Sequence, residues 1–155
     1  MSRAMTLAYG AVAYVIFFVT FCYAIGFVGN FMVPKSIDTG EPGPFWTSLA
    51  VNVALLGLFG LQHSVMARPG FKRMAGRLIA APFERSTYVL ASSLAVLALV
   101  LLWQPLPGIA WRVAGPPAAM LRAAGFAGLL LAAWATMLQT PSDLLGLYQA
   151  RRFAR

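Results

Sequence analysis

The stretch AMTLAYGAVAYVIFFVTFCYAIGFVGNFMVP, residues 4–34, contains no charged side chain. Three more charge-free windows follow it, at residues 42–67, 86–111 and 123–142. A helix needs about 20 mostly apolar residues to cross the hydrocarbon core of a bilayer, and a soluble domain rarely contains so many long uncharged runs. The four windows therefore predict four transmembrane helices.

The composition of the whole chain supports this prediction. Of the 155 residues, 60% are hydrophobic and only 10% are charged, which is too few polar groups to cover the surface of a soluble domain. We predict an all-α membrane helical bundle, one domain over residues 1–155, with spans at about 7–31, 45–66, 87–110 and 123–141. The first apolar stretch is much longer than the roughly 7–15 residues of a signal-peptide core, so we expect it to remain as a span.

The positive charges are unevenly distributed between the two sides of the predicted bundle. Four spans place both termini and the second connection on one side. The cations on that side are Arg3, Arg68, Lys72, Arg73, Arg77, Arg85, Arg151, Arg152 and Arg155, whereas the other side has Lys35, Arg112 and Arg122. The positive-inside rule then predicts cytoplasmic termini and a multi-pass membrane protein. The cations are not interleaved with base-reading motifs, so we expect a lipid bilayer and no nucleic acid as partner.

The second connection has the pattern of an amphipathic helix that begins after Pro69. Its apolar positions are Phe71, Met74, Ala75, Leu78 and Ile79, and its basic positions are Lys72, Arg73 and Arg77. This spacing predicts a helix in the membrane interface. Two roles remain open: anchoring to anionic lipid head groups, or covering a cytoplasmic site and attracting an anionic cofactor.

The second predicted span carries the only histidine, His63, near its cytoplasmic end. Asn52, Gly60 and Ser64 share its broad helical face, and Gln62 lies beside that face. Three roles are open to His63: a packed hydrogen-bonding group, a proton-transfer group, or a ligand of metal or haem. No metal site is predicted, because no companion ligands stand at suitable spacing.

Small residues predict where helices approach closely. Gly57 and Gly60 in the second span, and Gly128, Ala132 and Thr136 in the fourth, suggest tight packing. No acidic side chain lies deep in a span, which argues against a proton-coupled exporter. A channel would need a continuous polar path, whereas the polar residues gather in the cytoplasmic half.

Four stretches carry a more specific pattern: TFCYAIGFVGNFMVPKSIDTG from Thr20, LFGLQHSVMARPGFKR from Leu58, ERSTYVLASSLAVL from Glu84, and SDLLGLYQ from Ser142. In order and spacing they resemble the bacterial methanethiol S-methyltransferases, a family grouped with nurim and related to NnrU-type membrane proteins. The resemblance implies a helical fold similar to isoprenylcysteine carboxyl methyltransferases. It also implies transfer of a methyl group from S-adenosylmethionine to methanethiol, giving dimethyl sulfide. A noncatalytic nurim-like or NnrU-like scaffold is the alternative hypothesis.

The resemblance suggests roles for particular side chains. His63 would accept the thiol proton, with Gln62 orienting it or the substrate. Residues expected to attract the carboxylate of S-adenosylmethionine are Arg68, Lys72 and Arg73, and residues expected to form or orient the thiol pocket are Asn52, Ser64, Glu84, Arg85, Asp143 and Gln149. Glu84 and Asp143 have a second interpretation, in which they pair with nearby cations or cap helices.

The chain departs from this family in one respect. Its members are longer, and the region that resembles the cofactor-binding half of related methyltransferases follows the position of Arg155. Three alternatives are open: a truncated or frameshifted copy, a second polypeptide that supplies the rest, or a mode of cofactor binding that the sequence does not reveal. The partner we expect is a missing C-terminal half or a second copy in a homo-oligomer.

Overall fold

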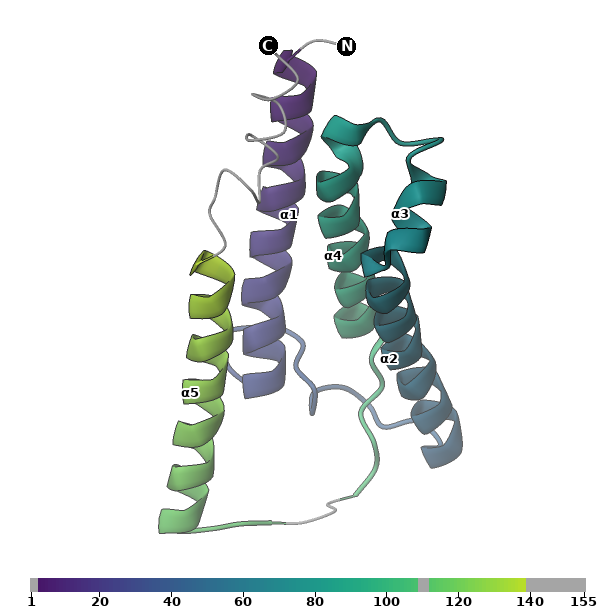
Figure 1. The fold of residues 1–155 in the computed structure, drawn as a ribbon. Helices are drawn as coiled ribbons and strands as arrows, with labels where there is room; N and C mark the ends of the chain where they lie inside the picture. Colours follow the sequence, from purple (N-terminus) through teal and green to yellow (C-terminus); the bar gives the residue numbers. More distant parts are fainter. Residues whose placement is uncertain (1–2, 109–111, 139–155) are drawn as a thin grey trace.

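The computed structural model describes residues 3–108 and 112–138 (Figure 1). Within these ranges the chain consists of helices and the loops that connect them, with no strand. The helices are α1 (Arg3–Gly29), α2 (Phe45–Ala67), α3 (Pro69–Ala75), the short 3₁₀ helix η1 (Ala81–Phe83), α4 (Glu84–Leu102) and α5 (Pro116–Leu138). Four helical segments are long and apolar enough to cross a membrane: α1, α2, η1 with α4, and α5. The predicted all-α class with four spans is therefore confirmed.

The most extensive packing joins α1 to α4 and α4 to α2. Buried side chains recur at seven-residue intervals on both partners of the first pair: Thr6, Ala13, Thr20 and Phe27 on α1, and Ser86, Ser93 and Val100 on α4. A seven-residue repeat keeps one face of a helix turned towards its neighbour, and small side chains let the backbones approach. This seam forms the centre of the molecule.

The glycines that were predicted to allow close helix packing do not lie at helix contacts. In the described part of the chain, an added Cβ at Gly57, Gly60 or Gly128 would have no other atom within 4 Å. Close approach occurs instead at Gly26, where an added Cβ would lie 2.7 Å from the carbonyl oxygen of Phe31. The side chain of Thr136 lies outside the described residues. Gly57, Gly60 and Gly128 therefore make no close contact between helices, whereas serine, threonine and alanine recur in the seam between α1 and α4.

Local sequence signals explain where α1 and α2 end. Asn30 has a positive φ of 56°, and the N–H of Phe31 donates to the carbonyl oxygen of Gly26 at 3.1 Å, which is the hydrogen bond of a Schellman C-cap. Arg68 leaves the helical region with ψ 140°, because the residue before a proline is pushed towards an extended conformation. Pro69 then starts α3, a position that its ring favours.

The third and fourth spans differ from their predicted bounds. Helix α4 ends at Leu102 rather than near residue 110, and Trp103 has an extended ψ of 136°. Gln104 precedes Pro105, and proline has no N–H with which to continue a helix. Helix α5 begins at Pro116 rather than near residue 123, so Arg122 lies within it. The boundaries of uncharged windows therefore do not mark the helix ends here.

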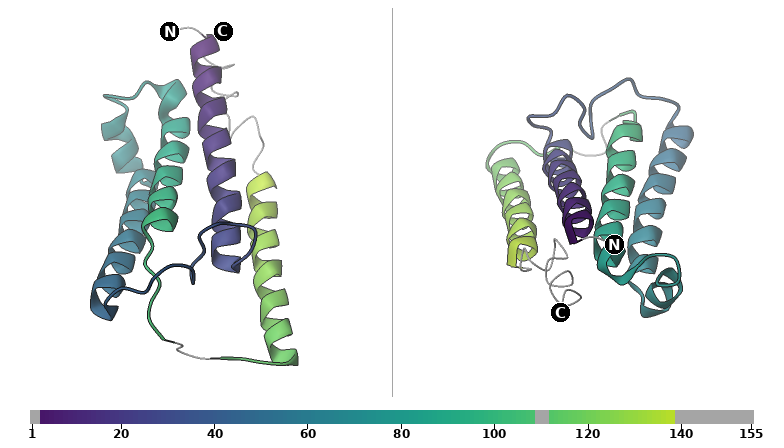
Figure 2. Two further views of the ribbon diagram at one scale, coloured as in Figure 1. Left: turned by 180° about the vertical axis from the view of Figure 1, so that it is seen from behind. Right: turned by 90° about the horizontal axis from the view of Figure 1, so that it is seen from above.

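Successive long helices along the chain run in opposite directions, and their spatial order is α5, α1, α4, α2 (Figure 2). The neighbours α1 and α4 therefore run in the same direction, whereas α2 is antiparallel to α4 (Figure 1). Helix α5 stands beside the others, and none of the residues in its most apolar window is buried. The rings of Phe31 and Phe126 contact each other at a centroid distance of 5.5 Å, which links α5 to the end of α1. Helices α1, α4 and α2 therefore form the packed part, and α3 lies over one end of it (Figure 1).

Candidate active site

Four polar side chains meet between α2 and α4, close to the end where α2 stops and α4 starts. We call this group the polar cluster; its members are Gln62, His63, Tyr88 and Ser92. His63 lies four residues before the end of α2 and Tyr88 four residues after the start of α4. Since the two helices are antiparallel neighbours, both side chains lie about 6 Å, one helical turn, inside the same end.

The contact between Tyr88 and His63 is the central feature of this cluster. The Tyr88 hydroxyl lies 3.0 Å from Nε2 and 3.1 Å from Nδ1 of His63. The ring centroids are 5.3 Å apart with an interplanar angle of 44°, and Phe59 contacts the imidazole at 5.4 Å. The His63 side chain is exposed. The imidazole is therefore held between two aromatic rings while keeping an accessible surface.

Ser92 and Gln62 complete the cluster. The Gln62 amide Nε2 donates to Ser92 Oγ at 3.3 Å and lies 3.0 Å from the Met66 sulfur, while His63 Nδ1 lies 3.4 Å from the same Ser92 oxygen. The other amide atom, Gln62 Oε1, is buried and has no hydrogen-bond partner in the described part of the chain. An unpaired buried acceptor typically costs about 1–3 kcal/mol. A ligand donor that reached this oxygen would recover that energy.

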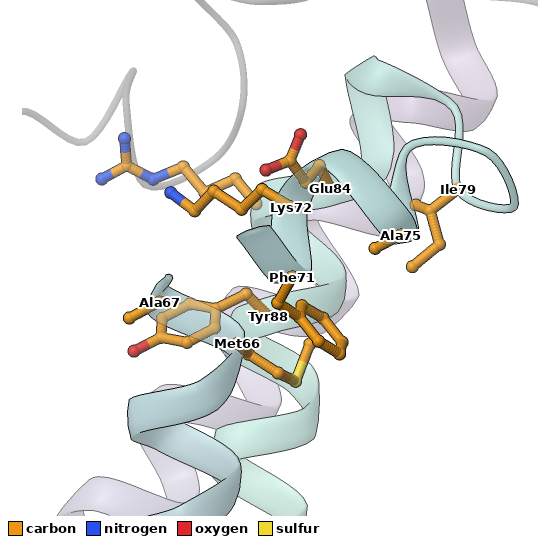
Figure 3. Close-up of a pocket in the computed structure, with 9 residues that line it drawn as sticks. Met66, Ala67, Phe71, Lys72, Ala75, Ile79, Glu84 and Tyr88 are labelled. Carbon is orange, nitrogen blue, oxygen red and sulfur yellow. The ribbon is translucent and has the colours of Figure 1, made fainter. Parts of the chain in front are cut away.

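A cleft of about 300 Å³ opens beside the cluster, under α3 (Figure 3). Its lining residues are Met66, Ala67, Phe71, Lys72, Ala75, Ile79, Glu84, Arg85 and Tyr88. Met66, Phe71 and Tyr88 form an apolar and aromatic floor, and Lys72 and Glu84 lie on the opposite side (Figure 3). The cleft thus offers aromatic faces together with charges of both signs.

The structure brings several of the predicted site residues together. His63 and Gln62 belong to the polar cluster, and Lys72, Glu84 and Arg85 line the cleft. The residues that lie exposed and outside the cleft lining are Ser64, Arg68 and Arg73. Asp143 and Gln149 lie outside the described residues. The N-cap position of α4 is Phe83, so Glu84 occupies the first turn of the helix and is not its cap.

Asn52 is not brought to this site. It is 3% exposed, its Nδ2 donates to the carbonyl oxygen of Gln104 at 2.7 Å, and its Oδ1 accepts from the N–H of Gln104 at 3.0 Å. Ser48, which is fully buried, donates to the side chain of the same glutamine at 3.1 Å. These bonds fix the start of α2 to the segment after α4, at the end of the helices opposite to the cleft (Figure 1). The surroundings of Asn52 in the structure are those of a packing residue.

Sequence analysis did not select Tyr88, Ser92, Phe71 or Met66 for this site. A signal was present for two of them, because Glu84, Tyr88 and Ser92 follow each other at four-residue steps and so share one helical face. In the described residues, no group of three or more His, Cys, Asp or Glu side chains is placed to hold a metal ion.

Comparison with known proteins adds independent information. No family model matches the sequence, and no solved structure matches it. A methanethiol S-methyltransferase of Bradyrhizobium diazoefficiens is 45% identical over 149 residues, which is 96% of this chain and 58% of the relative. The methanethiol S-methyltransferase of Mycobacterium tuberculosis is 46% identical over 138 residues, 89% of this chain and 55% of the relative.

A more distant similarity reaches the animal protein nurim. Nurim of Xenopus laevis is 33% identical over 75 residues, 47% of this chain and 26% of that protein. The chain spans about half the length of the methanethiol S-methyltransferases that it matches. Identities of 45% and 46% over about nine-tenths of the chain show common descent for that half. The chain is therefore homologous to the methanethiol S-methyltransferases over the segment that it shares with them.

Proposed function

We propose that the chain takes part in the methylation of methanethiol, with S-adenosylmethionine as the methyl donor and dimethyl sulfide as the product. The observation that carries the proposal is the hydrogen-bonded pair of His63 and Tyr88 at the edge of a cleft with aromatic and charged walls. The chain's homology to enzymes named for this reaction supports it.

The thiol must lose its proton before its sulfur becomes a strong nucleophile. His63 is the acceptor in this proposal, because imidazole changes its protonation near neutral pH more readily than any other unperturbed side chain. Gln62 orients the imidazole in this proposal, because its Nε2 donates to Ser92 Oγ at 3.3 Å and that oxygen lies 3.4 Å from Nδ1 of His63.

S-adenosylmethionine, when bound, supplies an electrophilic methyl carbon on a sulfonium sulfur. The cleft residues fit the amino-acid and sulfonium end of such a molecule. The ring faces of Phe71 and Tyr88 would attract the sulfonium of the donor. Glu84 would accept hydrogen bonds from its ammonium group, and Lys72 and Arg85 would bind its carboxylate.

The remaining basic residues and the size of the cleft define the rest of the proposal. Arg68 and Arg73 are exposed and outside the cleft, so their role is a field that attracts the anionic carboxylate over a distance. A volume of about 300 Å³ is at the small end of ligand sites. We propose that the other groups of the donor are bound by a C-terminal half or by a partner copy.

The apolar surroundings of the cleft favour the reaction. Attraction between a thiolate and a sulfonium is much stronger where water is excluded, and Met66, Phe71 and Tyr88 give the cleft an apolar floor. Methanethiol is small and apolar enough to arrive through lipid. By the distribution of Lys and Arg, we place the cleft at the cytoplasmic face of a bacterial inner membrane.

The test is a chimera in which this chain replaces the matching segment of the longer Bradyrhizobium relative, reconstituted in lipid vesicles. With S-adenosylmethionine and methanethiol, we expect dimethyl sulfide in the headspace gas and none when the donor is omitted. The chain alone in vesicles is expected to bind the donor more weakly than the chimera does. If a folded chimera forms no dimethyl sulfide and binds no donor, the chain is a noncatalytic scaffold and the proposal fails.

A further inference from the structure

Tyr88 connects the cleft to the histidine. In the described part of the chain, His63 has two hydrogen-bonding side-chain neighbours, Tyr88 and Ser92. Only Tyr88 also lines the cleft, whereas His63 itself does not. A proton released by a ligand in the cleft therefore reaches the imidazole most directly through the phenolic hydroxyl.

We propose that Tyr88 is a catalytic residue that relays the thiol proton from the cleft to His63. This inference rests on the proposed function and assigns it a residue that neither the homology nor the sequence pattern had identified. A phenolic hydroxyl is both a donor and an acceptor, so it can take one proton while giving up another.

The neighbouring hydrogen bonds prepare the imidazole for this role. Ser92 Oγ accepts from Gln62 Nε2 at 3.3 Å and lies 3.4 Å from His63 Nδ1. The Tyr88 hydroxyl lies 3.1 Å from Nδ1 and 3.0 Å from Nε2, so a proton on Nδ1 that is donated to Ser92 leaves Nε2 as the acceptor for Tyr88. In this relay Ser92 is a positioning residue that favours the tautomer with the proton on Nδ1.

The atoms and charges of the step balance. The S–H bond of the thiol breaks and its proton passes to the Tyr88 oxygen, while the phenolic proton passes to Nε2 of His63. The thiol sulfur keeps the electron pair of the S–H bond and uses it to form a bond to the methyl carbon. The bond between that carbon and the donor sulfur breaks, and its electron pair stays on the donor. One positive charge moves from the sulfonium to the imidazolium, which later releases its proton to water.

The main variant is Tyr88→Phe, which keeps the ring in the cleft and removes the hydroxyl. Its matched control is Tyr9→Phe, which loses the 3.0 Å hydrogen bond to Thr87 near the same end of the molecule but outside the cluster. In the chimera with methanethiol at neutral pH, we expect kcat to fall about 100-fold or more for Tyr88→Phe, as for a lost proton-transfer group. The KM for the thiol and the activity of the control should be close to those of the parent.

Thiol substrates of different acidity distinguish a proton relay through Tyr88 from a purely structural role of this residue. An aromatic thiol that is already ionised at neutral pH needs no proton acceptor, so the defect of Tyr88→Phe should become several-fold smaller with it. Raising the pH should likewise restore part of the rate with methanethiol. An unchanged kcat, or an equal loss for all thiols and at every pH, contradicts the relay. In both cases the parent still forms dimethyl sulfide, so the proposed function survives.

A measurement without the donor tests the same contact in the full chain. His63 is the only histidine, so the nitrogen NMR signals of ¹⁵N-histidine-labelled protein in detergent belong to it alone. We expect Nδ1 to carry the proton in the neutral ring, and the Nε2 signal to move in Tyr88→Phe but not in Tyr9→Phe. Identical Nε2 signals in the parent and Tyr88→Phe overturn the inference.

Replacement of Tyr88 by 3-fluorotyrosine covers the case in which Tyr88→Phe does not fold. The fluorinated ring keeps its shape and hydroxyl, but its phenol is more acidic. The pH–rate profile of the chimera should then shift to lower pH. A profile that coincides with that of the parent contradicts the relay.

Discussion

The hydroxyl of Tyr88 lies within 3.1 Å of both ring nitrogens of His63, although the two residues are 25 positions apart in the chain. The contact exists because α2 and α4 are antiparallel and each contributes a residue one turn from the shared end. Neither residue could form this pair within its own helix. The site is therefore a product of helix packing.

Replacing His63 with alanine should lower kcat for dimethyl sulfide formation by about 10²–10⁴-fold, the range for loss of a general base. Headspace gas chromatography of the chimera measures the product. Leu61→Ala, at an exposed apolar position on the same helix, is the control and should retain most of the activity. Parent-like turnover of a folded His63→Ala protein would falsify the assigned role of the imidazole.

Replacing Lys72 with alanine should raise the KM for S-adenosylmethionine about tenfold and leave the KM for methanethiol nearly unchanged. The reason is the loss of one charge-assisted bond to the donor carboxylate. Arg77→Ala removes an exposed cation that does not line the cleft and should have little effect at moderate salt. If both variants weaken the binding of S-adenosylmethionine equally, Lys72 makes no specific contact with the donor, and the cations act only through their combined electrostatic attraction.

Asn52→Ala should destabilise the protein by about 2 kcal/mol, because it removes two bonds to the backbone of Gln104 and leaves buried polar groups unpaired. Unfolding in mixed detergent micelles measures the change, with the exposed Val53→Ala as the control. The KM for the thiol should stay the same. A raised KM without a loss of stability would instead support the substrate-pocket role predicted from the sequence.

Gly26→Ala and Gly57→Ala should have opposite effects on stability. At Gly26 the new methyl group would meet the Phe31 carbonyl oxygen at 2.7 Å, and such overpacking typically costs about 1–3 kcal/mol. At Gly57 no other atom lies within 4 Å, so the better helix propensity of alanine should stabilise α2 by up to about 1 kcal/mol. A clear loss of stability in Gly57→Ala would show that this face is covered in the folded protein.

The orientation predicted from the charges can be tested by thiol labelling. In a Cys22→Ser background, Glu41→Cys should react with a membrane-impermeant maleimide added to intact spheroplasts. Arg73→Cys should react only after permeabilisation, since the positive-inside rule places it in the cytoplasm. The reverse pattern of labelling would put the cleft on the outside of the cell.

The spans could be predicted from the sequence because an uncharged apolar run is a local property. The seam between α1 and α4 also had a readable signal, the seven-residue repeat from Thr6 to Phe27, but small polar residues are less conspicuous than glycines. The helix ends depended on prolines: Pro69 follows the end of α2, where the second uncharged window also ends, and Pro105 follows the end of α4 inside the third uncharged window.

The site was only partly predictable for a geometric reason. A helical projection places Asn52 near His63 in angle, but eleven residues separate them, about 16 Å along the axis. The prediction used only the angle around the helix axis and so put Asn52 and His63 in one pocket, whereas the structure places Asn52 beside Gln104. Tyr88 was missed because its importance comes from the opposite helix, and a single sequence does not reveal which faces of two helices meet.

The bonds between Asn52 and Gln104 have a mechanical consequence. They clamp α2 to the segment that leaves α4 at the end opposite to the cleft, and the lever arm from this clamp to His63 is about 16 Å. A tilt of α2 about the clamp hardly moves Asn52 but displaces the imidazole by an amount that grows with that arm. A small tilt of α2 would therefore change the distance between His63 and Tyr88 while the opposite end of the helix stays in place.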